Sequence, residues 1–190
     1  MLMLDGGGCS STPLIFQKFF IKNETMITSK SNELSSQWKF IIAVLICQAV
    51  GITSGLLTQN EMITWFSTLN KPSWNPPAYL FGPVWTTLYL LMGISLWLVW
   101  KSNAPQIHKL RAELTFAVQL FLNFMWSILF FKCHSPLLAL FDIFLMIIVI
   151  LMTIGRFARI SKTAAWLLVP YLAWVCFATV LNYKIWALNM

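Results

Sequence analysis

Five long apolar stretches restrict the fold of this chain more than any other feature. They cover residues 40–57, 79–100, 114–131, 137–154 and 164–188. Each has the ~18–25 residues with which an α-helix crosses the hydrocarbon core of a bilayer. Only 10% of all residues are charged, whereas soluble domains carry roughly 25%. The sequence therefore predicts an all-α membrane protein in which residues 38–190 form one bundle of five transmembrane helices.

Residues 1–37 lack a long apolar stretch and are rich in Ser, Thr, Gly and Lys. This composition is typical of a disordered segment, so we expect a disordered N-terminal tail. Met26 is a candidate alternative start of the chain.

The connection between the first two stretches is rich in tryptophan and proline, and residues 65–85 read WFSTLNKPSWNPPAYLFGPVW. Proline fixes φ and removes a backbone donor, so residues 71–77 cannot lie inside a helix or a central strand. We expect a stiff loop, followed by a helix with Asn75 as its N-cap and a proline in its first position. The loop is long enough to fold over the bundle, and its candidate lid residues are Trp65, Trp74, Pro76 and Pro77.

Further helix starts are expected at Ser135 and at residues 161–163, and Pro170 should kink the fifth span. Small residues recur every fourth position in the first span, at Ala43, Cys47, Gly51 and Gly55. Such a stripe lets two helices approach closely. The partner helix lies in the same bundle or in a second copy of the chain, with the same bundle as the default.

Basic residues are distributed unevenly along the chain. Ten of the 13 Lys and Arg residues fall on the N-terminal side of the predicted spans, and the others are Lys71, Lys132 and Lys184. The positive-inside rule then places the N-terminus in the cytoplasm of a bacterium, with the Trp/Pro loop outside. In a eukaryote the mitochondrial outer membrane is the alternative location. Membrane topology thus accounts for the net charge of +7, and we expect no nucleic-acid partner.

Polar and aromatic side chains share one helical face in three spans. The second span contributes Trp85, Tyr89 and Met92, the third Gln119, Asn123 and Trp126, and the fifth Tyr171, Trp174, Ala178, Leu181 and Ile185. A packed aromatic core and a ligand cavity both produce this pattern. The amide of Asn123 among aromatic rings under a rigid loop favours a mostly apolar pocket for a flat hydrophobic ligand.

Asp142 is the only acidic residue inside a predicted span, so we expect it to face the bundle interior. A proton relay, a counter-charge for a ligand, and a protonated carboxyl bonded to a neighbouring helix are the alternatives, and we favour the last. The sequence has no phosphate loop, nucleophile elbow or metal cluster, and His108 and His134 fall in loops on opposite membrane faces.

Three segments closely resemble the tryptophan-rich sensory protein/translocator protein family, also called the peripheral-type benzodiazepine receptor. They are WFSTLNKPSWNPP at residues 65–77, FGPVWTTLY at residues 81–89, and AWLLVPYLAW with FATVLNY between residues 165 and 183. The resemblance runs in order through residues 38–188. It implies a five-helix bundle, usually a homodimer, that binds porphyrins and benzodiazepine-type or isoquinoline ligands. It implies no required cofactor, because the tetrapyrrole is the ligand.

Carried over to this sequence, the family's ligand pocket takes in Phe81, Gly82, Val84, Trp85, Asn123, Leu145, Trp174, Ala178 and Leu181. Some bacterial members degrade protoporphyrin photo-oxidatively with two tryptophans that match Trp85 and Trp174. Animal members end in a cholesterol-recognition pattern whose arginine position is occupied by Ala187 here, so cholesterol is a doubtful partner. The resemblance therefore leaves three hypotheses: a tetrapyrrole receptor or carrier, a porphyrin-degrading enzyme, and a stress-regulated membrane scaffold.

Overall fold

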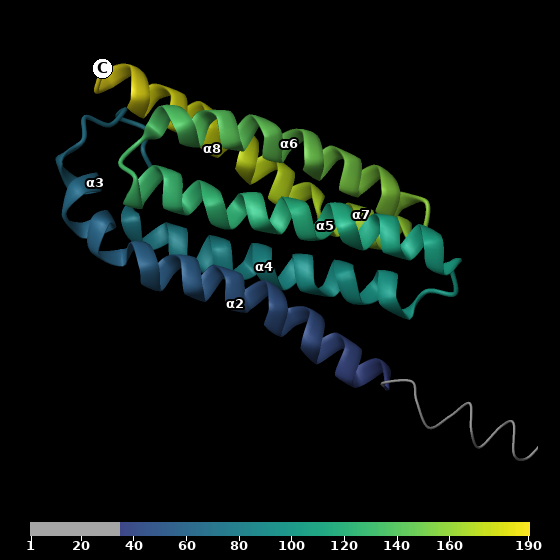
Figure 1. Ribbon diagram of the computed structural model, residues 1–190. Helices are drawn as coiled ribbons and strands as arrows, with labels where there is room; N and C mark the ends of the chain where they lie inside the picture. Colours follow the sequence, from purple (N-terminus) through teal and green to yellow (C-terminus); the bar gives the residue numbers. More distant parts are fainter. Residues whose placement is uncertain (1–34) are drawn as a thin grey trace, which may run out of the picture. The chain divides into compact units, whose positions relative to one another are not determined.

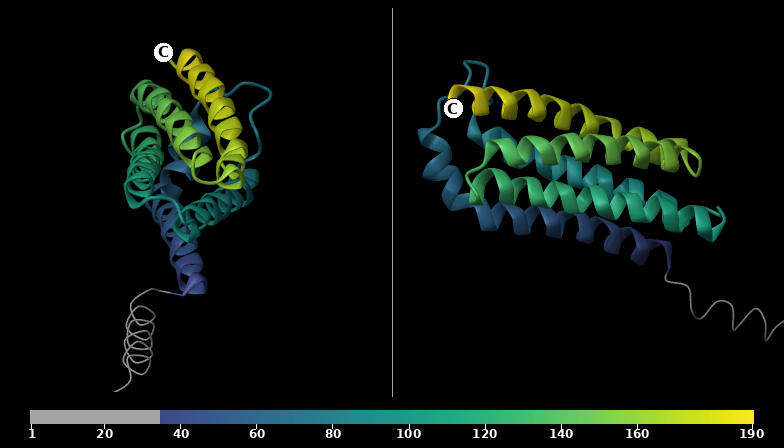
Figure 2. Two further views of the ribbon diagram at one scale, coloured as in Figure 1. Left: turned by 90° about the vertical axis from the view of Figure 1, so that its right-hand side faces the viewer. Right: turned by 45° about the horizontal axis from the view of Figure 1, so that its top comes forward.

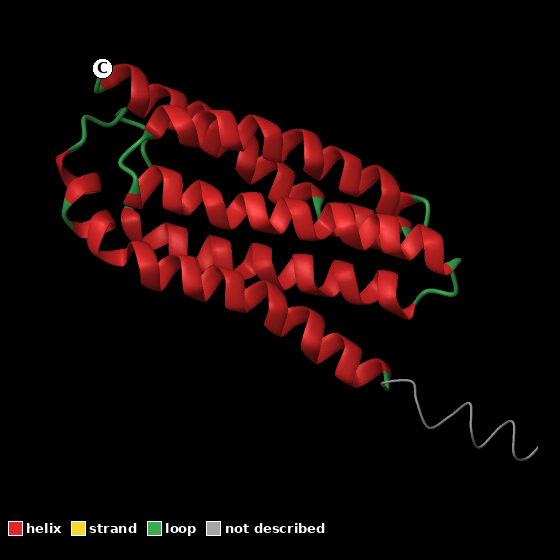
Figure 3. Ribbon diagram, viewed as in Figure 1, coloured by secondary structure: helices red, strands yellow, loops and turns green. Residues whose placement is uncertain are grey.

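The computed structural model describes residues 35–190, and residues 1–34 of the expected tail lie outside the described part. The described part is helical with short connections (Figures 1 and 3). Its elements are α2 (Ser36–Ile63), α3 (Trp65–Thr68), α4 (Ala78–Lys101), α5 (Gln106–Ser127), the π-helix η1 (Ile128–Lys132), α6 (Pro136–Ala158), α7 (Lys162–Leu167) and α8 (Val169–Leu188).

Five helical units are long and apolar enough to cross a membrane: α2, α4, α5 with η1, α6, and α7 with α8. This confirms the predicted order of five spans. Within the bundle, α2 packs against α4, α5 runs beside α6, and α6 also packs against α8 (Figures 1 and 2).

Two of the predicted helix starts are confirmed. The Ser135 side chain accepts a hydrogen bond from the Leu138 N–H at the start of α6, and Ser161 accepts one from Ala164 at the start of α7. The predicted start at Asn75 is wrong, because α4 begins at Ala78 with Pro77 at the N-cap. The reason is steric: a residue that precedes proline is driven out of the helical region, and both Asn75 and Pro76 precede one.

The third and fifth spans are interrupted. At the end of α5 the chain widens into η1, where the Cys133 N–H donates to the Ile128 carbonyl five residues earlier at 2.9 Å. The fifth span breaks at Leu168 between α7 and α8. This break confirms the expected effect of Pro170, which has no N–H to continue the helical ladder.

The first span packs closely against the second along their middle. Ala43 and Cys47 are fully buried, and a Cβ added to Gly51 would lie 2.3 Å from the Tyr89 ring of α4. A Cβ on Gly93 would likewise lie 2.7 Å from the Val44 Cα. The small residues of α2 therefore contact a helix of the same chain. Gly55 differs, since a Cβ there would meet nothing within 4 Å.

The second span contacts the fifth mainly at the end away from the Trp/Pro loop. There α4 packs on α7, and the buried Ser95 hydroxyl donates to the Ala164 carbonyl at 2.7 Å. Contacts between α4 and α8 are sparse by comparison. Large side chains fill the space between these two helices towards the loop, and this region contains the candidate site.

Candidate ligand-binding site

A small cavity lies between α4, α5 and α8 at the loop end of the bundle. Its volume is about 30 Å³, which is room for about two water molecules. We call it the inner cavity. Its lining residues are Met62, Phe66, Ala78, Phe81, Trp85, Trp126, Phe130, Phe131, Trp174, Ala178, Leu181, Asn182 and Ile185.

A larger groove of about 460 Å³ lies beside it, between the loop-side halves of α2 and α4. We call it the α2–α4 groove. Neither space has a charged residue in its lining. The two spaces adjoin, because six lining residues belong to both: Met62, Ala78, Phe81, Trp85, Trp126 and Phe131.

Aromatic rings occupy most of the volume between α4 and α8. The ring of Phe81 meets that of Trp174 edge to face, with centroids 6.1 Å apart. The Trp85 ring lies 6.3 Å from that of Tyr171 and 5.5 Å from that of Tyr89. These separations are typical of packed aromatic pairs. A planar macrocycle fits the inner cavity only if some of these rings move.

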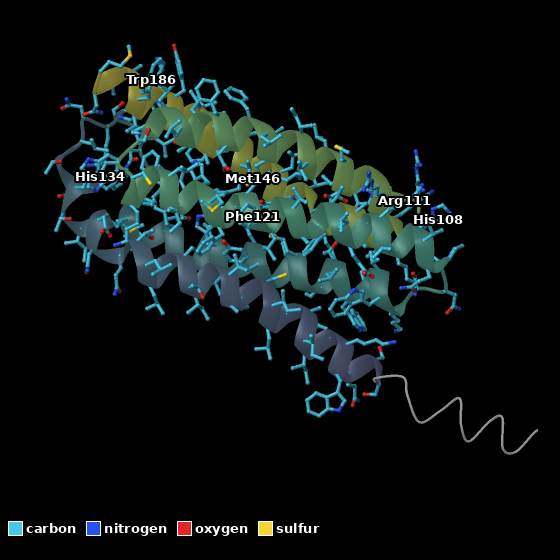
Figure 4. All side chains as sticks on the ribbon, in the orientation of Figure 1. His108, Arg111, Phe121, His134, Met146 and Trp186 are labelled. Atoms are coloured by element: carbon cyan, nitrogen blue, oxygen red, sulfur yellow. The ribbon has the colours of Figure 1, made fainter. Side chains whose placement is uncertain are left out.

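A buried polar network lies deeper in the bundle. The Tyr89 hydroxyl donates to Asn123 Oδ1, and Asn123 Nδ2 donates to the Tyr171 hydroxyl at 3.3 Å. The Tyr171 hydroxyl in turn donates to Met146 Sδ at 3.3 Å, near the middle of the bundle (Figure 4). Asn123 is inward-facing, as its position on the third span predicts, and both ends of its amide are occupied by tyrosines.

The residues assigned through the resemblance fall in different places. Five of them line the inner cavity: Phe81, Trp85, Trp174, Ala178 and Leu181. Gly82 lines the α2–α4 groove, and Val84 packs against the core beside Trp85. Leu145 is 50% exposed on α6 and is not part of either lining.

The candidate lid residues lie around the site rather than in its lining. Trp65 of α3 stacks on His134 with ring centroids 4.5 Å apart, and Trp74 meets Phe177 of α8 at 5.9 Å. Pro76 and Pro77 lead into α4. Two residues near these four do line the inner cavity. They are Phe66 of α3 and Ala78, the first residue of α4.

The connection is fastened to the C-terminal end of α8. The Asn70 N–H donates to Asn189 Oδ1 at 2.9 Å, and Asn189 Nδ2 donates back to the Asn70 carbonyl at 2.9 Å. We call this pair the Asn70–Asn189 clasp. Lys71 caps the carbonyls of Ser67 and Leu69.

Two polar side chains line the inner cavity: Asn182, which the sequence pattern does not single out, and Trp126, which lies on the predicted inward face of the third span. Asn182 is only 1% exposed. Its Nδ2 donates to the Pro136 carbonyl at 2.8 Å, and its Oδ1 has no partner among the described residues. Trp126 Nε1 is also buried without an acceptor there. Asn182 lies four residues after Ala178, hence on the same helical face, and this spacing was the available signal.

Asp142 lies on α6 with its carboxyl partly buried. Its Oδ2 has no hydrogen-bond partner in the described part of the chain, so the expected bond to a neighbouring helix is not present at that atom. His108 and His134 lie at opposite ends of the bundle (Figure 4). His134 lies in the connection between η1 and α6, but His108 lies in the first turn of α5, so its predicted place in a loop is wrong.

Comparisons with known proteins agree on one group of relatives. The model of the TspO/MBR family matches residues 43–187. The chain is 45% identical to the tryptophan-rich protein TspO of Chlorobaculum tepidum, over 78% of this chain and 94% of that protein. It is 41% identical to the translocator protein of Homo sapiens, over 68% of this chain and 77% of that protein. A tryptophan-rich sensory protein of Cereibacter sphaeroides is 34% identical over 82% of this chain and 95% of its own length.

Proposed function

Because the chain belongs to the TspO/MBR family, we propose that it is a membrane receptor or carrier for tetrapyrroles and other planar hydrophobic ligands. The ligand binds in the inner cavity together with the adjoining α2–α4 groove. The observation that carries this proposal is the common wall of the two spaces, which is formed by Trp85, Phe81 and Trp126 with three further apolar side chains. Indole and phenyl faces offer a flat ligand stacking contacts without a fixed charge.

Rotation of the aromatic side chains in this wall joins the groove to the inner cavity. The combined space then extends from the surface of the bundle to Trp174 and Asn182 of α8. The Trp126 N–H and Asn182 Oδ1, which have no partner among residues 35–190, supply one donor and one acceptor. These groups orient a ligand that is otherwise held by apolar contact. Three residues assigned through the resemblance, Val84, Asn123 and Leu145, line neither space, and the proposed site omits them.

A sensor and a carrier would both bind a ligand from the bilayer and release it again. One relative bears the name of a sensory protein and another that of a translocator. Both roles begin with the same binding step, so that step is the one to test first.

Titration of the purified protein in lipid nanodiscs with protoporphyrin IX, followed by quenching of tryptophan fluorescence, tests the proposal. We expect saturable quenching in the wild type. Trp174→Phe should weaken binding about five- to tenfold, or ~1–1.4 kcal/mol, because it removes an indole from the cavity wall. Trp166→Phe is the matched control, since Trp166 is 71% exposed on α7 and should leave the affinity unchanged. Linear, non-saturable quenching in the wild type would contradict the proposal.

Photo-oxidative porphyrin breakdown is a second candidate function, favoured by the presence of both Trp85 and Trp174 in the wall of one cavity. Light and dioxygen would be the co-reactants. Illumination of the protein–porphyrin complex in air should then bleach the Soret band and yield a new product, with no change in the dark or under argon. Trp174→Phe is illuminated at a porphyrin concentration that restores full occupancy of the site. If its Soret band then bleaches at the wild-type rate, the protein does not catalyse the breakdown.

A further inference from the structure

The α2–α4 groove opens on the surface that the bundle turns towards lipid. Large apolar side chains flank its glycines on α2, where Ile52 is 60% exposed and Leu56 is 63% exposed. In a chain with five membrane-spanning units, such side chains contact acyl chains rather than water. The groove is therefore accessible from within the bilayer.

Glycines keep this groove open. Gly55 on α2 and Gly82 on α4 both line it, and a Cβ at either position would meet no atom within 4 Å. Deeper between the same two helices, Gly51 lies directly against the ring of Tyr89. The helices thus touch in the middle of the bundle, and towards the loop the groove lies between them.

Two aromatic side chains lie where the groove adjoins the inner cavity. The rings of Phe81 and Trp85 belong to both linings, so rotation of these rings widens the contact between the two spaces. Side-chain rotations of this kind occur far faster than rearrangements of packed helices or loops.

The aqueous end of the site is, in contrast, closed by several bonds. The Asn70–Asn189 clasp holds the Trp/Pro connection on α8 with two hydrogen bonds of 2.9 Å. Glu61 at the end of α2 forms an ion pair with Lys132 of η1 at 2.6 Å. A ligand that entered from water between these elements would have to break such contacts.

We propose that ligands enter the site sideways from the bilayer through the α2–α4 groove while the Trp/Pro connection stays closed. The ligand is a lipid-soluble planar molecule that first lies in the groove and then reaches the inner cavity as Phe81 and Trp85 turn aside. The Gln59 amide at the groove offers hydrogen bonds to polar groups at the edge of the ligand, and the Thr86 hydroxyl, which donates to the Gly82 carbonyl, can still accept one. This inference rests on the proposed function and specifies the route to the same site.

Association kinetics test the route. Nanodiscs containing the protein are mixed in a stopped-flow instrument with phosphatidylcholine vesicles preloaded with protoporphyrin IX, and tryptophan quenching is followed over time. Gly55→Phe fills the groove without adding an indole. We expect it to slow association at least tenfold and, because the groove also belongs to the site, to weaken binding. Loss of groove contacts alone would instead speed dissociation and leave association at the wild-type rate. Gly82→Phe, which fills the groove from α4, should act in the same way and replaces Gly55→Phe if that variant does not fold.

Two controls separate the groove from the loop. Gly155→Phe also adds a ring in open space, but on α6, and should leave the rates within twofold of the wild type. Asn189→Ala breaks the Asn70–Asn189 clasp, and the rates should again stay within twofold. The lateral route is refuted if Asn189→Ala accelerates association, or if the folded Gly55→Phe and Gly82→Phe proteins bind at the wild-type rate. Absence of saturable binding in the wild type would instead refute the proposed function.

Discussion

At the residue scale, the polar side chains of the interior divide into two kinds. Asn123 satisfies two buried tyrosine hydroxyls at once and thereby connects three spans. Gln119, one turn earlier on α5, is equally buried, yet neither its Nε2 nor its Oε1 has a partner in residues 35–190. The sequence predicts that both face inward. It does not distinguish them, because the partners of Asn123 come from distant spans.

Substitution of these two amides should have opposite effects on stability. Asn123→Leu leaves the Tyr89 hydroxyl without its acceptor and leaves the Tyr171 hydroxyl with Met146 Sδ alone. We expect a loss of about 1–2 kcal/mol, since interhelical hydrogen bonds in membranes are worth roughly 0.6–1.7 kcal/mol each. Gln119→Met keeps the shape and removes an unpaired buried amide, which should be neutral or stabilising. Thermal unfolding in detergent measures both. If both variants shifted the melting temperature in the same direction, the described difference in hydrogen bonding between Asn123 and Gln119 would be contradicted.

Leu145 provides a test of how far the family's pocket can be transferred to this chain. The resemblance includes Leu145 in the pocket, whereas half of its side chain is exposed. Leu145→Ala should therefore leave the protoporphyrin affinity within twofold of the wild type. Leu181→Ala is the matched comparison, because Leu181 is buried in the wall of the inner cavity, and it should weaken binding at least threefold. Equal losses in the two variants would restore Leu145 to the site.

At the element scale, the sequence predicts the features that have a local cause. Ser135 and Ser161 begin helices because their side chains cap free N–H groups, and Pro170 interrupts a span because it lacks an N–H. The π-helix η1 has no comparable local signal. Phe130 and Phe131 both line the inner cavity. Phe130 lies four residues after Trp126 and so continues the predicted inward face. The adjacent Phe131 would lie on another face of a regular helix, so 3.6-residue periodicity could not identify it.

The contact between α2 and α4 should be sensitive to a single methyl group. A Cβ on Gly93 would lie 2.7 Å from the backbone of Val44, so Gly93→Ala forces the helices apart. We expect a loss of ~1–3 kcal/mol, as is typical of overpacked cores, seen as a lower melting temperature. Gly155→Ala on α6 meets nothing within 4 Å and serves as the control. It should be neutral or slightly stabilising, because alanine favours a helix. If Gly93→Ala matches it, the two helices are less tightly packed than described.

At the scale of the whole molecule, the ends of the bundle differ in charge. Lys101, Lys109, Arg111, Arg156, Arg159 and Lys162 lie with Lys39 at one end, whereas Lys71, Lys132 and Lys184 lie at the other. Figure 4 shows Arg111 and His108 at the first end and His134 and Trp186 at the second. The uneven distribution is readable from the sequence because it depends only on the order of the spans. The α2–α4 groove could not be predicted from the sequence, because it depends on how the two helices diverge.

This asymmetry predicts the orientation of the protein in a bacterial membrane. Positive-inside topology places the loop after α4 in the cytoplasm and the turn after η1 outside. Cys133, which is exposed in that turn, is kept as the single cysteine of a variant in which Cys9, Cys47 and Cys176 are replaced by alanine. A membrane-impermeant maleimide should label it in intact cells. With Cys133 also replaced, Asn103→Cys introduces a thiol in the opposite loop, which should be labelled only after lysis. The reverse pattern would invert the topology, and the Trp/Pro connection would then face the cytoplasm.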